Sequence, residues 1–127
     1  MKFIIDASIF IDYLRGGIIG KHIFDEIEKE NGELFIPTIV IFELFSGKSS
    51  DKPSVSIKIT NFIHNFERID LTEEIAIRAG KMYRELGKQI SPQDYIVAAS
   101  ALEIGATVVT LNIKHFQNIP VLALYPI

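Results

Sequence analysis

The chain has 127 residues, of which 48% are hydrophobic and 23% charged, and its formal net charge is −3 at pH 7. These values predict one compact domain spanning residues 1–127 and exclude a disordered chain. The net charge gives no basic footprint for nucleic acid, although bound divalent cations would reverse the sign of the local charge at an acidic site. The lack of cysteine excludes disulfides and thiolate metal sites. No apolar run approaches the ~20 residues of a membrane span, which predicts a cytoplasmic protein without membrane contact.

Short apolar runs alternate along the chain with longer segments in which apolar residues follow helical spacing. The short runs predict strands at residues 2–5, 33–36, 67–70, 107–111 and 121–124. The longer segments predict helices at residues 8–15, 18–29, 38–46, 55–66, 72–86 and 91–103, with a loop at 47–54. The alternation predicts an α/β fold in which a parallel sheet carries helices on both faces.

Three acids lie beside apolar runs: Asp6 directly after the first strand, Glu43 inside an apolar helix, and Asp94 at the start of another. Burying a charge without a partner costs free energy, so the position of each of these three acids requires a structural or functional explanation. In parallel sheets the ligand site lies beyond the carboxyl ends of the strands, where converging carboxylates would repel one another unless a cation neutralised them. Three carboxylates with waters suit Mg²⁺, so the residues suggest a metal-dependent phosphotransfer site.

Each acid also has a purely structural interpretation. Asp6 could cap the following helix, and Glu43 could occupy a narrow solvent-facing stripe. Asp94 follows Ser91 at the spacing of a capping box, and on spacing alone capping and metal binding are equally supported. Ser8 favours a helix N-cap, with orientation of a neighbouring carboxylate as the alternative.

Other polar residues give weaker signals. Asp12 favours a solvated helix position. The three histidines show no metal-ligand spacing and favour surface positions: His22, His64 and His115.

Four segments, in order, resemble the motifs of the PIN-domain family, and specifically of its VapC-type toxin nucleases. They are FIIDASIFIDYL at 3–14, PTIVIFEL at 37–44, SPQDYIVAASAL at 91–102 and ATVVTLNIKHF at 106–116. Each motif alone is weak, but their order and spacing are fairly specific and span nearly the whole chain. The resemblance implies a three-layer PIN-like sandwich, in which helices flank a five-stranded parallel sheet of order 3-2-1-4-5.

The resemblance also implies an Mg²⁺- or Mn²⁺-dependent endoribonuclease that hydrolyses RNA phosphodiester bonds. Asp6, Glu43 and Asp94 would be its catalytic metal ligands, which decides the interpretation of Asp94 in favour of metal. Three polar residues would orient waters and carboxylates around them: Ser8, Thr110 and Asn112. The expected partners are RNA, a cognate antitoxin protein and a second copy in a homodimer.

One departure from the family pattern keeps a second hypothesis open. Many relatives carry a fourth acid in the last motif, at the position of Asn112 or of His115, and neither is acidic here. The alternative is a catalytically weak or inactive PIN-like module that binds RNA or a protein. A small phosphatase is disfavoured, because Ser8 stands where such enzymes need a second aspartate. Three basic residues near the motifs could contact phosphates: Arg15, Lys48 and Lys114.

Overall fold

A central parallel sheet with the strand order β3-β2-β1-β4 organises the computed structural model, which describes all residues, 1–127. Its strands are β1 (Lys2–Ile5), β2 (Glu33–Pro37), β3 (Glu67–Ile69) and β4 (Thr107–Val109). β1 lies in the interior of the sheet, because Phe3 pairs with Leu34 of β2 on one side and with Thr107 of β4 on the other. The carboxyl ends of neighbouring strands therefore meet at one edge.

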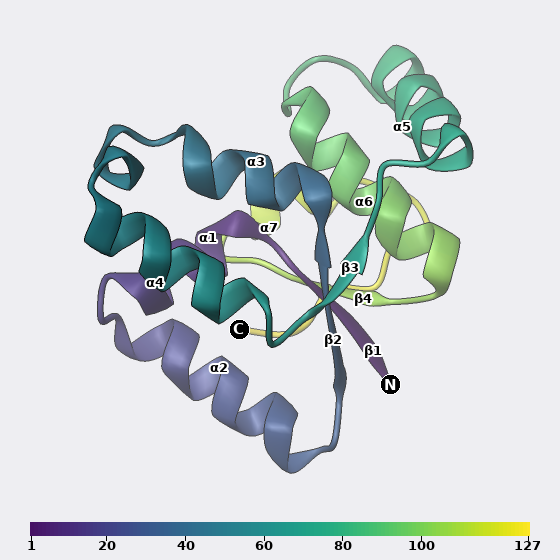
Figure 1. The fold of residues 1–127 in the computed structure, drawn as a ribbon. Helices are drawn as coiled ribbons and strands as arrows, with labels where there is room; N and C mark the ends of the chain where they lie inside the picture. The colour runs from purple at the N-terminus through teal and green to yellow at the C-terminus, as the bar shows by residue number, and fades with distance from the viewer.

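Helices cover both faces of this sheet, as Figure 1 shows, with α2 and α4 on one side and α5 and α6 on the other. The helices are α1 (Ala7–Leu14), α2 (Ile18–Lys29), α3 (Thr38–Ser46), α4 (Pro53–Ile63), α5 (Glu73–Leu86), α6 (Pro92–Ile104) and α7 (Ile113–Phe116). The predicted helix-flanked parallel sheet is confirmed. None of the helices combines the length and hydrophobicity that crossing a membrane would require.

The sheet has four strands where five were expected. At 121–124 only a single parallel bridge forms, between Val108 of β4 and Leu124. Pro120 lacks an amide hydrogen, and Val121 has a positive φ of 67°, so the backbone before this bridge cannot continue a ladder. The segment still lies beside β4, in the position that the order 3-2-1-4-5 gives to the fifth strand. β4 is also shorter than predicted, and the expected loop at 47–54 contains a short 3₁₀ helix, η1 (Lys48–Asp51).

Two kinds of packing fix the sheet between its helix layers. Aromatic rings from α1, α2 and α4 and from the residue before β3 pack together, with ring centroids 4.5–6.0 Å apart: Phe10, Tyr13, Phe24, Phe62 and Phe66. On the other face α6 contacts β1 and β4, and it carries small, fully buried side chains: Ala98, Ala99 and Ala101. Because the carboxyl ends of β1, β2 and β4 are buried, they are held in fixed positions.

Asp12 joins α1 to α2. Its Oδ2 accepts a hydrogen bond of 2.7 Å from the amide of Gly20, and the residue is half-buried. A Cβ on Gly17 would overlap this carboxylate, so the glycine leaves room for it. The prediction of a solvated helix position for Asp12 was therefore wrong, because a tertiary contact eight residues away holds the side chain.

We expect Asp12→Ala to lower the free energy of unfolding by about 1–3 kcal/mol, since it removes the carboxylate that accepts from a buried glycine amide. Urea denaturation monitored by circular dichroism measures this loss. Asp25→Ala is the matched control on α2, because its carboxylate pairs with Lys21 at the surface and contributes less than about 1 kcal/mol. Equal stability of the two variants would contradict the role assigned to Asp12.

Candidate metal and active site

Three acids reach the carboxyl edge of the sheet from three different elements. Asp6 directly follows β1, Glu43 lies in α3, which follows β2, and Asp94 lies in the first turn of α6. Figure 1 shows β1 and β2 leading into α1 and α3 at this edge. Asp6 is 3% exposed and Asp94 7% exposed, while Glu43 is half-buried. The chain therefore buries acidic groups where parallel sheets place their ligand sites.

The charges of the three acids act on one another. Burial, followed by the charges of Asp6 and Asp94, raises the pKa of Glu43 to about 7. Burial and then the charge of Asp6 raise the pKa of Asp94. In addition, Oε1 of Glu43 is buried without any hydrogen-bond partner. The structure therefore brings the three carboxylates within electrostatic reach, and each would gain from a nearby cation.

No three carboxylate, imidazole or thiol side chains lie close enough, as they stand, to hold a metal ion together. Mg²⁺ typically binds only one or two carboxylates directly and keeps several waters, so a hydrated ion does not require closer contact. The unpaired Oε1 of Glu43 and the raised pKa values fit such an ion. Coordination of one ion by Asp6, Glu43 and Asp94 stays a prediction.

Two hydroxyl groups orient the carboxylate of Asp6. Thr110 Oγ1 donates to Asp6 Oδ2 at 2.8 Å and Ser8 Oγ donates to the same atom at 3.0 Å. Each hydroxyl oxygen also accepts a backbone amide, from Asn112 at 2.9 Å and from Leu111 at 3.0 Å. These amides direct both hydroxyl protons toward Oδ2, which leaves Oδ1 without a hydrogen bond inside the chain.

The expectation that Ser8 caps the first helix was wrong. Asp6 occupies the N-cap position of α1, and its side chain makes no capping hydrogen bond either. Ser8 instead orients the Asp6 carboxylate, which was the alternative interpretation. Asn112 contributes its backbone amide to Thr110, and its exposed side chain makes no hydrogen bond, so a role for that side chain stays a prediction.

Asp94 combines a helix cap with a histidine contact. Its amide donates to Ser91 Oγ at 3.2 Å, which is one half of the predicted capping box. Its carboxylate is not committed to the other half, because Oδ2 lies 2.9 Å from Nδ1 of His115. His115 comes from α7 and its side chain is 47% exposed. The contacts with His115 and Ser91 partly offset the rise in the pKa of Asp94.

Sequence reasoning missed His115 as a partner of Asp94. The two residues are 21 positions apart and lie on different helices, so no local spacing connects them. The only signal was the place of His115 in the last motif. A cavity of about 570 Å³ lies between α2 and α4, but none of the three acids lines it, so it is not part of the candidate site.

The fold and the acidic edge are those of a known family. The family model described as PIN domain matches residues 3–122, so this chain belongs to the PIN-domain family. The match covers all three acids and confirms the resemblance seen in the motifs.

Within the family the chain is of the VapC type. It is 35% identical over 104 residues to "Ribonuclease VapC2" of Rickettsia felis, a match that covers 78% of each chain. It is 28% identical over 121 residues to "Ribonuclease VapC19" of Mycobacterium tuberculosis, covering 92% of this chain and 94% of the relative.

Solved structures show the same architecture. VapBC2 from Rickettsia felis, bound to a DNA fragment from its promoter, superimposes with a TM-score of 0.84 at 27% identity, covering 98% of both chains. DNA-bound VapBC from Salmonella typhimurium gives a TM-score of 0.84 at 25% identity, covering 98% of this chain and 97% of that chain.

Proposed function

We propose that this protein is a metal-dependent endoribonuclease and the toxin of a toxin–antitoxin pair. One observation carries the proposal: the buried, unpaired Oε1 of Glu43 lies within the electrostatic reach of Asp6 and Asp94. The names of the relatives support the reaction, since a further one, from Salmonella typhimurium, is called "tRNA(fMet)-specific endonuclease VapC" and is 28% identical over 125 residues.

Different residues of the chain have different proposed roles in this reaction. Asp6 and Asp94 would hold an Mg²⁺ or Mn²⁺ ion, and Glu43 would contribute its carboxylate to the same site. When bound, the cation lowers the pKa of a water and neutralises charge on the scissile phosphate. Glu43 Oε1, which has no partner within the chain, accepts a hydrogen bond from the attacking water and orients it. Ser8 and Thr110 keep the Asp6 carboxylate in one orientation throughout.

A cleavage assay tests this proposal. Purified protein is incubated with labelled RNA in Mn²⁺, in Mg²⁺, in EDTA, and in EDTA followed by excess Mn²⁺. We expect cleavage with either metal, none in EDTA, and recovery on re-addition. The products should end in a phosphate and a hydroxyl, without the cyclic phosphate that attack by the ribose 2′-hydroxyl would leave. Undiminished cleavage in EDTA would contradict metal dependence.

The second candidate is a PIN-like module that binds RNA or a protein without cutting RNA. Asn112 and His115 favour it, because they leave the last motif without an acid. The same assay separates the two functions: retention of RNA with no turnover at saturating Mn²⁺ supports the module.

An antitoxin partner and a homodimer belong to the same proposal. The solved VapBC neighbours support an antitoxin. Exposed apolar side chains on α3 and beside α5 offer surface for such partners, with Phe42 58% exposed and Leu71 46% exposed. Co-expression with a candidate antitoxin, followed by light scattering of the purified product, tests both.

We expect Thr110→Val to weaken Mn²⁺ binding by roughly 10- to 100-fold, as loss of a group that orients a metal ligand typically does. Valine matches the shape of threonine but cannot donate to Asp6 Oδ2 or accept from Asn112. Isothermal titration calorimetry measures the affinity without any need for turnover. Thr60→Val, at a half-buried position on α4, is the control that should leave metal binding unchanged. Equal metal affinity of Thr110→Val and wild type would remove Thr110 from the site.

A further inference from the structure

One short segment, the turn from β4 into α7, contacts both aspartates of the candidate site. Thr110 Oγ1 donates to Asp6 Oδ2 at 2.8 Å, and His115 Nδ1 lies 2.9 Å from Asp94 Oδ2. Asp6 follows β1 and Asp94 lies in α6, so the two acids have no local connection of their own. The residues of this turn are therefore placed to orient both carboxylates.

The turn is anchored at both ends. At its start Thr110 is buried, and its hydroxyl oxygen accepts the amide of Asn112 at 2.9 Å. At its end the ring of Phe116 is fully buried in the core, and the amide of His115 donates to the carbonyl oxygen of Asn112 at 2.9 Å. Because the backbone on both sides of His115 is fixed, its ring is held beside Asp94 although the side chain is partly in contact with water.

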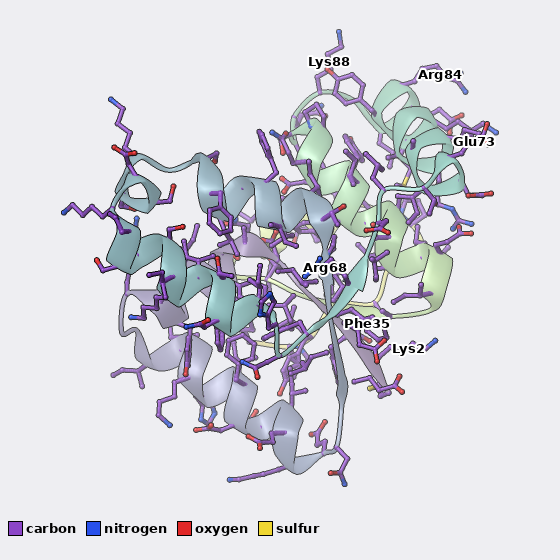
Figure 2. All side chains as sticks on the ribbon, in the orientation of Figure 1. Lys2, Phe35, Arg68, Glu73, Arg84 and Lys88 are labelled. Atoms are coloured by element: carbon purple, nitrogen blue, oxygen red, sulfur yellow. The ribbon has the colours of Figure 1, made fainter.

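His115 is the only side chain that forms an ion pair with Asp94. Helix α5 packs against α6, but Arg84 and Lys88 extend outward from the end of α5, as Figure 2 shows, and neither pairs with Asp94. An ionised carboxylate can only accept hydrogen bonds, so the contact requires the ring proton on Nδ1 of His115. A carboxylate at position 115 would repel Asp94, whereas an imidazole N–H donates to it.

The same ring nitrogen is poorly placed to bind the cation itself. Nδ1 of His115 faces Asp94 Oδ2, so direct ligation through this nitrogen would break the contact. Mg²⁺ and Mn²⁺ also prefer carboxylate, carbonyl and water oxygens, whereas imidazole suits zinc, copper and iron. Groups that hydrogen-bond a ligating carboxylate, in contrast, fix its orientation in many metal sites. Asp6 has such groups in Ser8 and Thr110.

We infer that His115 is a positioning residue of the metal site, whose Nδ1–H donates to Asp94 Oδ2 and fixes the orientation in which this carboxylate meets the cation. His115 itself does not bind the cation. Together, Thr110 and His115 make the turn after β4 the element that orients both aspartates. This inference rests on the proposed function and specifies how a chain with no acid at position 112 or 115 orients Asp94.

Isothermal titration calorimetry with Mn²⁺ tests the inference without any need for turnover. His115→Ala removes the donor, His115→Asn supplies an amide donor near the position of Nδ1, and His115→Asp supplies a ligand oxygen that carries no proton when ionised. His22→Ala is the matched control, because Nε2 of His22 pairs with Glu26 Oε1 at 3.1 Å on the exposed side of α2. Circular dichroism melting in EDTA confirms that each variant is folded.

We expect His115→Ala to bind Mn²⁺ roughly 10- to 100-fold more weakly than wild type. His115→Asn should recover most of this loss, His115→Asp should not recover it, and His22→Ala should match wild type. Pulsed electron paramagnetic resonance of bound Mn²⁺ should show no coordinated imidazole nitrogen. In the metal-free protein at pH 8, NMR should place the proton of the His115 ring on Nδ1.

Several outcomes would overturn the inference. Wild-type Mn²⁺ affinity in His115→Ala would do so even if wild type cleaves RNA. A coordinated imidazole nitrogen that disappears in His115→Ala, or recovery by His115→Asp and not by His115→Asn, would make His115 a ligand of the ion instead. Absence of Mn²⁺ binding by wild type would contradict both this role and the proposed metal dependence. The expected pattern of Mn²⁺ affinities, with no RNA cleavage by wild type, would support the role of His115 while the nuclease function failed.

Discussion

Replacing Asp6 with asparagine is expected to lower kcat/KM for metal-dependent RNA cleavage by at least about 10³-fold. Asp6 is almost fully buried at the end of β1, and the hydroxyls of Ser8 and Thr110 both orient it. Asparagine keeps the shape of the side chain and one acceptor oxygen but removes the negative charge that would hold the cation. Single-turnover cleavage of labelled RNA at saturating Mn²⁺ measures the loss.

Stability measurements separate this catalytic loss from unfolding. The charge of Asp6 raises the pKa values of Glu43 and Asp94, which means that the three acids repel one another in the folded protein. Asp6→Asn should therefore be at least as stable as wild type in EDTA, but Mn²⁺ should raise its melting temperature less. Asp70→Asn is the matched control, because Asp70 also directly follows a strand, β3, but is exposed. Wild-type cleavage by Asp6→Asn would refute the proposed site.

Local sequence patterns predicted most of the elements, for identifiable physical reasons. β1 is buried along Phe3–Ile5, so its sequence is a continuous apolar run. Helix α6 has start and stop signals in its own sequence, since the hydroxyl of its N-cap, Ser91, accepts a hydrogen bond from the amide of Asp94, and Gly105 ends the helix with a positive φ of 68°. The prediction of a fifth strand was wrong because Val121 has a positive φ, and the sequence gives no sign of this, since β-branched residues rarely adopt that conformation.

The candidate site was only partly predictable. Its three acids were visible because their sequence neighbours are apolar, and burial of Asp6 and Asp94 confirms that part of the reasoning. The groups that orient Asp6 were predicted only through the family resemblance and as the alternative interpretation of Ser8, because Thr110 contacts Asp6 across 104 residues and no local pattern connects them.

Glu43 should make the metal-free protein less stable as the pH rises. Its pKa in the folded protein is about 7, above the 4.5 of the unconstrained group, chiefly because of burial. Between these values the folded state binds more protons than the unfolded state, so the free energy of unfolding falls as the pH increases. For this half-buried group we expect a loss of about 1–3 kcal/mol between pH 5 and pH 8 in EDTA. The raised pKa of Asp94 acts in the same direction.

Glu43→Gln tests this expectation, because glutamine has nearly the same shape and carries no charge at any pH. In EDTA the variant should lose the Glu43 share of the pH dependence and be more stable than wild type at pH 8, while Mn²⁺ should stabilise wild type more than the variant. Urea denaturation at pH 5, 6.5 and 8, with EDTA or Mn²⁺, measures the free energy of unfolding of both proteins under each condition. Glu33→Gln, at an exposed position, is the matched control and should follow wild type. If Glu43→Gln is less stable than wild type at pH 8 in EDTA, the Glu43 carboxylate stabilises the metal-free fold. That result would contradict its proposed role as a group that needs a cation.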